Sequence, residues 1–351
     1  MPLALPPDEA RAFLQGQAPA PMLDLVGMMA CHAVTAGLRL GLFDALAEGA
    51  RDLPGLSAEL KADPEALTLL LDLLVRTGYL ERDEHGYANS AASAASLCTG
   101  SPTYYGHVLP VWHAIVGELW DGLADAVRTG RPPGGFYPWL EQRPRLSAAF
   151  HTLQGGLASW LAEEVVELAG PLEGATGLLD LGGGHGLYSE AFCRAHPRLT
   201  ATVVDLPGAL QDGTAHERVT RHAADLAKEG IDGAYDVVLL FNVLHGFPED
   251  EARGLLARAA GAVRQGGRLL VLETVLEPAD EHRGGQAEAA FTAGFSLSLW
   301  HTQGGAVRPA QTIEGWLGEA GCVALARHEL SRSATHTLFI ATPAAGREML
   351  R

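Results

Sequence analysis

A cluster of glycines directly after an apolar run is the first feature with the makings of a binding site. Residues 178–181 are apolar enough for a buried strand, and Gly182, Gly183, Gly184 and Gly186 follow. Glycine lets the backbone turn tightly and approach a ligand closely before a helix begins. The pattern predicts a pocket for a flat, polar molecule at the end of this strand.

Three acidic residues are spaced to contact the parts of such a molecule. Asp205 ends the next apolar run, where a carboxylate can accept hydrogen bonds from both hydroxyls of a ribose. Asp225 follows a third strand region, which lies ahead of residues 235–241, and there it can accept a hydrogen bond from the amino group of an adenine. Asp180 precedes the glycines, and a carboxylate there suits the zwitterionic methionine end of S-adenosylmethionine (SAM). We therefore predict a SAM pocket, to which we also assign Leu206, Leu226 and Asn242.

A nicotinamide dinucleotide is the competing ligand, because its binding motif also uses glycines and an acid at the end of the second strand. The position of the third glycine in that motif is Leu187 here. Asp180 would also repel a pyrophosphate. Both residues favour SAM over NAD, although an NAD oxidoreductase stays open as another class of enzyme.

The elements that position these residues alternate between short apolar runs and amphipathic helices. We expect strands over residues 177–181, 200–204, 235–241 and 268–273, and two closing runs that pair as an antiparallel edge. This βαβ order predicts an α/β fold with a mainly parallel, Rossmann-like sheet. A stretch rich in glycine and proline precedes the first strand, so we place the domains at 1–170 and 171–351.

The first half is mainly helical and contains the pattern of a winged helix. Asp63 and Pro64 start a helix that Gly78 ends, and a small hairpin follows. Winged helices often bind DNA, but the helix over residues 64–77 carries one arginine, two acids and many leucines. Its charge argues against DNA binding.

The composition points to a small-molecule partner in the cytoplasm. A net charge of -17 and a pI near 5.2 are unfavourable for binding nucleic acid or its phosphates. The four cysteines are scattered, as expected in a reducing compartment. We find no signal peptide and no uninterrupted run of about 18 apolar residues, so we expect neither secretion nor a membrane span.

The glycine loop, together with residues 241–251 (FNVLHGFPEDE) and 263–273 (VRQGGRLLVLE), resembles the plant caffeate-type and bacterial small-molecule O-methyltransferases. Residues 41–46 (GLFDAL) resemble the N-terminal dimerisation domain of that family, which implies a homodimer. The resemblance implies that His245 is the catalytic base and that Glu273 orients it. It also implies SAM binding by Asp180, Gly182, Gly184, Asp205 and Asp225.

The expected fold is consistent with these roles. His245 follows the strand expected over residues 235–241, and Glu273 ends the strand expected over 268–273, so both reach the carboxyl edge of the sheet. A phenol with a pKa near about 10 is mostly protonated at neutral pH, and a neutral imidazole beside it can take the proton. We therefore expect O-methylation of a small metabolite.

The sequence departs from that family at two positions beside the expected base. Gly246 stands where the family has an aspartate, and Val307 stands where a second acid would brace the histidine. The departures keep open a protein that binds SAM without transferring methyl.

They also keep open C-methylation of an α-keto acid through its enolate. His245, Glu273 and His301 are evenly spaced along the chain, and two histidines with one carboxylate can hold a divalent metal with open positions. Without a metal, His301 would contact the acceptor, together with Trp300 and Trp112.

Overall fold

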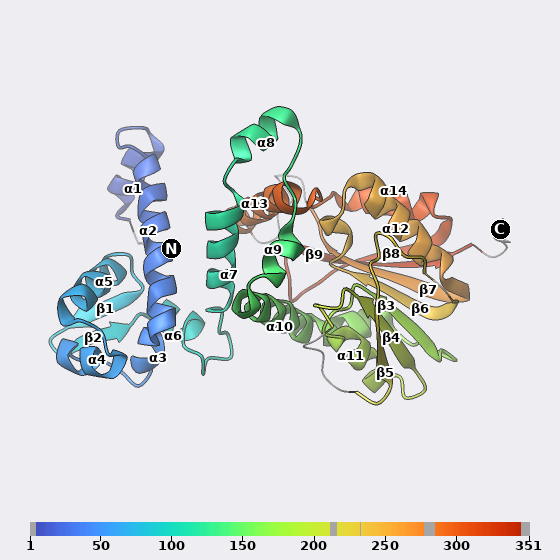
Figure 1. The fold of residues 1–351 in the computed structure, drawn as a ribbon, viewed down its shortest axis with the longest axis horizontal. Coiled ribbons are helices and arrows are strands. Elements are labelled where there is room, and N and C mark those ends of the chain that lie inside the picture. The colour runs from blue at the N-terminus through green and yellow to red at the C-terminus, as the bar shows by residue number, and fades with distance from the viewer. Residues whose placement is uncertain (1–4, 211–215, 232, 277–284, 345–351) are drawn as a thin grey trace. The chain divides into compact units, whose positions relative to one another are not determined.

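The contacts within the chain divide it into two compact units, one up to Leu119 and the other from Trp120 (Figure 1). The computed structural model describes residues 5–210, 216–231, 233–276 and 285–344. The division lies ahead of the predicted boundary near residue 170, where α10 (Pro144–Ala169) ends. The second unit includes α10 because Leu161 and Val165 pack into a core cluster of its sheet.

The first unit is mainly helical and ends in a π-helical turn over Ile115–Leu119. Its other described elements are α1 (Pro7–Leu14), α2 (Pro21–Leu40), α3 (Leu42–Ala45), α4 (Leu53–Leu60), α5 (Pro64–Arg76), β1 (Leu80–Asp83), β2 (Gly86–Asn89), α6 (Ala91–Ser96) and α7 (Val108–Ala114). The pair α4 and α5 with the antiparallel hairpin β1–β2 confirms the winged helix.

The helix α5 forms for the reasons that its sequence indicated. The Asp63 side chain accepts a hydrogen bond from the amide of Ala66 at 2.9 Å, which caps the first turn. Leu67, Leu71 and Leu74 lie on one face and are buried in the core of the unit. Burial of this stripe is the main source of the helix's stability.

The helix α2 is long and apolar enough, by length and composition alone, to cross a membrane. Core helices of globular proteins meet the same criterion, and Ala33 and Val34 of α2 pack into the core of the first unit. The sequence of α2 contains no uninterrupted apolar run of that length, and the helix meets the criterion through its mean hydropathy.

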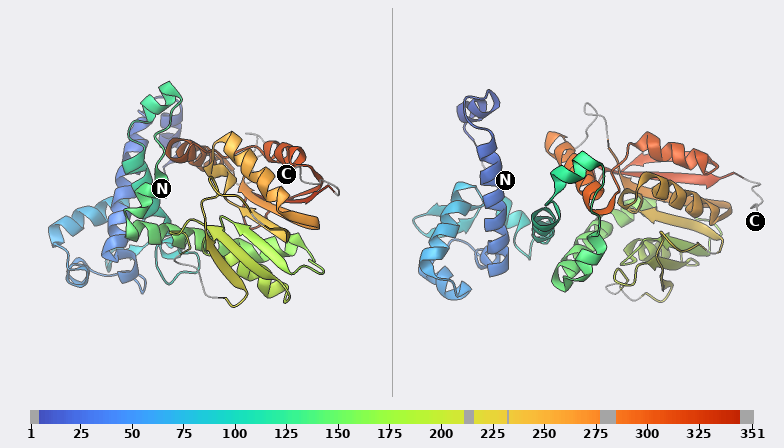
Figure 2. Two further views of the ribbon diagram at one scale, coloured as in Figure 1. Left: turned by 45° about the vertical axis from the view of Figure 1, so that its right-hand side comes forward. Right: turned by 45° about the horizontal axis from the view of Figure 1, so that its top comes forward.

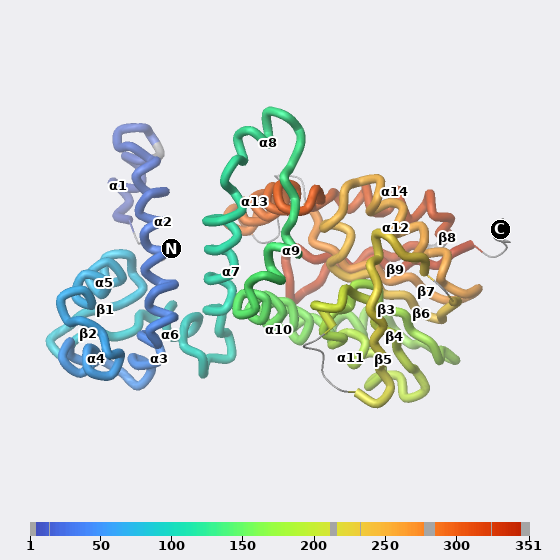
Figure 3. Tube along the Cα trace, viewed as in Figure 1, coloured from blue at the N-terminus to red at the C-terminus, as the bar shows by residue number. Residues whose placement is uncertain are grey.

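The second unit contains a sheet with the order β5-β4-β3-β6-β7-β9-β8. Its strands are β3 (Gly177–Leu181), β4 (Thr200–Asp205), β5 (Val219–Ala223), β6 (Tyr235–Phe241), β7 (Val263–Thr274), β8 (Cys322–Glu329) and β9 (His336–Pro343). The first five are parallel, and β9 runs antiparallel between β7 and β8, as can be followed along the trace (Figure 3). The Rossmann-like sheet with an antiparallel edge is confirmed.

Helices cover both faces of this sheet (Figures 1 and 2). The helices α10 and α11 (Leu187–Ala195) pack on one face, and α12 (Glu249–Gly261) and α14 (Ala310–Glu319) pack on the other. The remaining described helices of the unit are α8 (Leu123–Thr129), α9 (Phe136–Glu141), the short turn η2 (Leu244–Gly246) and α13 (Gly285–Gln303). Because β3, β4, β6 and β7 are parallel, the residues that follow β3, β4 and β6 and those that end β7 lie along one edge.

Candidate active site

The glycine loop is fastened to the end of β4 at this edge. The amide of Gly184 donates to Asp205 Oδ2 at 2.9 Å, and the amide of Leu206 donates to Asp205 Oδ1 at 2.7 Å. Gly182 and Gly184 have φ of 72° and 45°, a region that favours glycine. The loop and Asp205 therefore form one structural unit, as a cofactor pocket between two neighbouring strands requires.

The carboxylate of Asp180 lies buried beneath the same loop. Ser189 Oγ donates to its Oδ2 at 2.7 Å, whereas Oδ1 has no hydrogen-bond partner among the described residues. Burial raises the pKa of Asp180 to about 7, although the Ser189 hydrogen bond lowers it. A buried acceptor without a partner is rare in folded proteins, and a cation or donor of a ligand would satisfy it.

The other residues assigned to the cofactor pocket differ in their surroundings. Asn242 follows β6 with φ of 56°, and its buried Oδ1 has no partner within the described part of the chain. Asp225 follows β5 and pairs with Lys228 at 2.6 Å, and this hydrogen bond lowers the pKa of Asp225. Leu226 packs against a core cluster of the sheet. Asn242 and Asp180 thus present unsatisfied acceptors, whereas Asp225 is already engaged.

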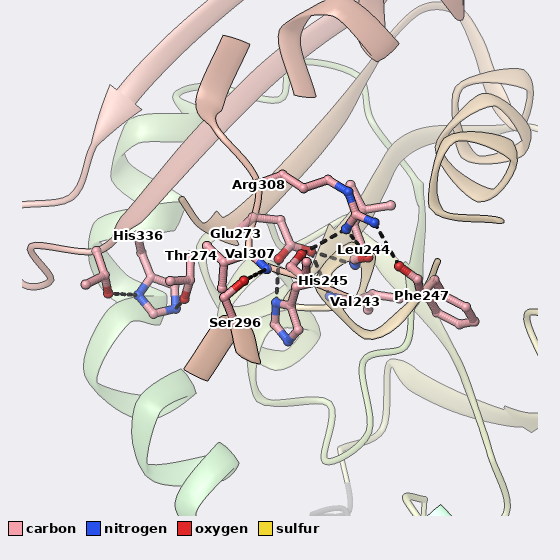
Figure 4. A network of polar contacts seen from close by, with 12 residues as sticks. Val243, Leu244, His245, Phe247, Glu273, Thr274, Ser296, Val307, Arg308 and His336 are labelled. Carbon is pink, nitrogen blue, oxygen red and sulfur yellow. Dashed lines mark hydrogen bonds and ion pairs between the residues drawn. The ribbon is translucent and has the colours of Figure 1, made fainter. Parts of the chain in front are cut away.

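His245 and Glu273 meet at this edge, as their positions after β6 and in β7 predicted (Figure 4). His245 Nδ1 lies 2.6 Å from Glu273 Oε2, and the His245 side chain is 14% exposed while that of Glu273 is 2% exposed. Glu273 Oε1 accepts the amides of Val243 at 2.9 Å and Leu244 at 2.7 Å. Both carboxylate oxygens of Glu273 therefore have hydrogen-bond partners: Oε1 has the amides of the turn, and Oε2 has the imidazole of His245.

Arg308 also contacts this turn, and the sequence had not indicated it (Figure 4). Its guanidinium donates to the carbonyls of Leu244 at 3.3 Å and Phe247 at 3.0 Å. The neighbouring Val307 is buried and apolar, so its side chain gives the ring no polar support. The available sequence signal was a charged residue directly after the Gly-Gly-Ala-Val segment. It did not reveal the role of Arg308, because the partners of Arg308 are backbone carbonyls.

Gly305 packs so closely beneath His245 that a side chain has no room. A Cβ on Gly305 would lie 2.0 Å from the His245 carbonyl oxygen and 2.7 Å from the carbonyl carbon of Gly246. We expect Gly305→Ala to displace the turn and lower kcat by up to about 100-fold. Steady-state kinetics checks this, with Gly315→Ala in open space on α14 as the control that keeps wild-type kcat. Unchanged kcat in Gly305→Ala would contradict the tight fit.

Two aromatic residues of α13 lie beside the His245 ring. The Phe295 ring lies edge-on to His245 with centroids 5.4 Å apart, and Phe291 stacks on Phe295 at 6.3 Å. Neither phenylalanine was among the residues assigned to substrate. Together they present an apolar wall suited to a planar molecule.

The predicted substrate residues are spread over both units. His301 is fully buried in α13, its carbonyl accepts the amide of Gly134 at 3.3 Å, and Trp300 is its half-buried neighbour. Trp112 belongs to α7 of the first unit. Among the described residues no three His, Cys, Asp or Glu side chains are grouped to hold a metal ion. His245, Glu273 and His301, the trio of the metal-dependent alternative, are therefore not grouped in this way.

Comparison with known proteins gives consistent matches along most of the chain. The family models of an O-methyltransferase domain and an O-methyltransferase dimerisation domain match residues 120–323 and 23–99. The 3-hydroxy-5-methyl-1-naphthoate 3-O-methyltransferase of Streptomyces sahachiroi is 29% identical over 318 residues, 87% of this chain and 89% of that protein. The bacteriochlorophyllide d C-20 methyltransferase of Chlorobaculum tepidum is 29% identical over 264 residues, 72% and 77% of the two chains. Human N-acetylserotonin methyltransferase in complex with SAM superposes with a TM-score of 0.75 at 25% identity, covering 97% of this chain and 99% of that one.

The fold and these matches define the protein as a SAM-dependent methyltransferase. Within that class, the chain belongs to the O-methyltransferase family with an N-terminal dimerisation domain. The resemblance noted from the sequence is confirmed. These matches favour a methyltransferase over the alternative of an NAD oxidoreductase.

Proposed function

We propose that this enzyme transfers the methyl group of SAM to a hydroxyl oxygen of a small metabolite, with His245 as general base. The observation that carries the proposal is the 2.6 Å contact between His245 Nδ1 and Glu273 Oε2. Glu273 accepts hydrogen bonds at both of its carboxylate oxygens. One of them is therefore suited to accept Nδ1–H of His245 and to orient the ring. Nε2 is then the ring atom with a lone pair for a proton.

The chain's residues contribute to the reaction by position and by proton transfer. SAM supplies an electrophilic methyl group, and a hydroxyl that attacks it must lose its proton. His245 Nε2 takes that proton, and the α13 wall of Phe291 and Phe295 orients the acceptor ring beside it. General-base help of this kind contributes about 100-fold to 10,000-fold.

The carboxylates and the amide side chain at the strand edge fit the parts of SAM. Asp180 would receive the ammonium of the methionine end, since its Oδ1 has no partner among the described residues. Asp205 would accept the ribose hydroxyls, and burial raises the pKa of this carboxyl too. Asn242 would supply a further acceptor at the end of β6. For Asp225 the pairing with Lys228 must open first.

Incubation with labelled SAM and a panel of phenols, hydroxyquinones and α-keto acids tests the proposed function. We expect label on the oxygen of a phenol or hydroxyquinone, identified by mass analysis, with turnover unaffected by chelators. Label on carbon of an α-keto acid, lost on adding a chelator, would replace O-methylation by the metal-assisted alternative. Binding of SAM without any labelled product across the panel would favour a non-methylating role.

We also infer a homodimer that assembles through α2. Four apolar side chains recur on α2 at helical spacing and are about half exposed: Met22, Leu25, Met28 and Met29. An apolar stripe of this kind marks a protein interface, and residues 23–99 match the dimerisation model.

The change Leu25→Glu is expected to convert the dimer to a monomer at micromolar concentration, because it places a charge on the apolar stripe. Light scattering after size exclusion measures the mass. Val323→Glu, at an exposed position on β8, is the control that stays dimeric. A Leu25→Glu protein that keeps the dimer mass would place the interface elsewhere.

Two further inferences concern location and domain division. We infer a cytoplasmic enzyme, supported by four free cysteines at positions 31, 98, 193 and 322. We keep residues 171–351 as the part that binds SAM. The helices of residues 120–170 pack with that part through α10.

A further inference from the structure

We propose that Arg308 is a positioning residue that fixes the orientation of His245. This inference rests on the proposed role of His245 as the base. Arg308 Nη1 donates to the carbonyl of Leu244 at 3.3 Å, and Nη2 donates to the carbonyl of Phe247 at 3.0 Å. These two carbonyls bracket His245 in the chain, so one planar group spans the turn that presents the imidazole (Figure 4).

The turn depends on such external contacts because it has little internal structure. It is a three-residue 3-10 turn, closed by the amide of Gly246 to Val243 at 3.0 Å and the amide of Phe247 to Leu244 at 3.2 Å. Short 3-10 turns have weak hydrogen-bond geometry. Glu273 holds the amides at the start of the turn, and Arg308 holds carbonyls along it. The two residues clamp opposite polar groups of one segment.

Arg308 is itself held rigidly, as a positioning residue must be. Its guanidinium lies 5.1 Å from the ring centroid of Trp316 and donates to the Ala306 carbonyl at 2.9 Å. Its own carbonyl accepts the amide of Leu276, just beyond the end of β7 that carries Glu273, at 3.0 Å. The clamp therefore ties η2 to the strand of the carboxylate and to α14.

The electrostatics favour the same arrangement. Burial lowers the pKa of Arg308, while the carboxylates of Glu249 and Glu273 counteract this effect. Arg308, Glu273 and His245 line one small hollow, so the guanidinium charge lies near the carboxylate that holds the imidazole. Val307 beside it is apolar, and its amide donates to Ser296 Oγ at 3.1 Å. Of these two neighbours, Arg308 is therefore the one whose side chain hydrogen-bonds to the turn of His245.

The test compares Arg308→Met and Arg308→Lys with a matched control, Arg332→Met. Arg332 also stacks on a tryptophan, Trp160 at 5.6 Å, and donates to a backbone carbonyl, but it lies on the loop between β8 and β9. We expect Arg308→Met to lower kcat by about 10- to 100-fold, with the Kd for SAM within about twofold of wild type. Lysine keeps the charge but cannot bridge two carbonyls with a planar fork, so the kcat of Arg308→Lys should lie between those of wild type and Arg308→Met.

Two readouts separate positioning from general loss of structure. The SAM-binding stoichiometry by calorimetry gives the active fraction, and kcat is expressed per binding site. A third variant, Arg308→Ala, leaves space for a small molecule. Added guanidinium should restore part of its kcat and none of that of His245→Ala. If the Met variant does not fold, the Lys variant carries the comparison.

The outcomes distinguish this inference from the proposed function beneath it. A wild-type kcat per site in Arg308→Met, or in Arg308→Lys if only that variant folds, overturns the inference while an inactive His245→Ala leaves the base in place. Wild-type transfer by His245→Ala overturns the proposed function, and with it this role of Arg308. A loss of kcat as large in Arg332→Met would show that any arginine of this kind matters, which also overturns the inference.

Discussion

Replacing His245 with alanine is expected to lower kcat for methyl transfer by about 100-fold to 10,000-fold, the usual contribution of a general base. The imidazole has one nitrogen committed to Glu273, and its removal leaves the acceptor hydroxyl without a proton acceptor. The Kd for SAM should stay within about twofold, because Asp180, Asp205 and the glycine loop belong to β3, to β4 and to the segment after β3, not to the turn of His245. Single-turnover assays with labelled SAM and calorimetry measure the two quantities separately.

A matched control uses His85, a histidine in the hairpin turn whose side chain is 74% exposed. His85→Ala should leave both kcat and SAM affinity unchanged. Glu273→Gln should fall between wild type and His245→Ala, because an amide can still accept from Nδ1 but carries no charge. If His245→Ala transferred methyl at the wild-type rate, the acceptor would have to lose its proton elsewhere.

The affinity for SAM is expected to weaken by up to about tenfold per pH unit as the pH falls below about 7, and Asp180→Asn should abolish this dependence. Burial raises the pKa of Asp180 to about 7, so the carboxyl is protonated under mildly acidic conditions. A protonated carboxyl offers the ammonium of SAM no charge. Calorimetry between pH 5.5 and 8.5, chosen to bracket that pKa, measures the affinity and the protons released on binding.

The stability of the empty protein should change in the opposite sense. The folded state holds a proton on Asp180 that the unfolded chain releases near pH 4, at the usual pKa of an aspartate. This contribution to stability is therefore fully present below about pH 4 and is lost as the pH rises to about 7. Saturating SAM should offset the loss, because a ligand that binds the folded state stabilises it.

Asp225→Asn provides the control for this pH dependence. The hydrogen bond from Lys228 lowers the pKa of Asp225, so this carboxylate is ionised over the whole range and its removal should leave the pH profile unchanged. An affinity for wild-type protein that is flat from pH 5.5 to 8.5 would show that Asp180 does not pair with the ammonium.

The sequence was sufficient for the features that local pattern controls. Apolar runs and glycines placed β3, its loop and Asp205 together, because buried parallel strands end at one edge. The same rule brought His245 and Glu273 together from β6 and β7.

Other features depend on contacts that carry no sequence signature. Arg308 recognises carbonyl oxygens, which every residue possesses, so no partner residue could reveal it. The unit boundary at Leu119 depends on α10 packing onto the sheet, although α10 has the same helical periodicity as the helices before it. His301 is buried in α13, and chain spacing alone could not show that it lies outside a metal-binding group.

The position of β9 between β7 and the edge strand β8 sets an order for biosynthesis. This strand, His336–Pro343, follows both β7 and β8 in the sequence yet pairs between them, and Thr337 lies opposite Glu273. Synthesis proceeds from the N-terminus, so the first unit can fold while the sheet still lacks an inner strand. The strand β7, which carries Glu273, gains its second neighbouring strand only after β9 has been synthesised. A nascent chain is therefore expected to fold its first unit before Glu273 has a paired strand on both sides.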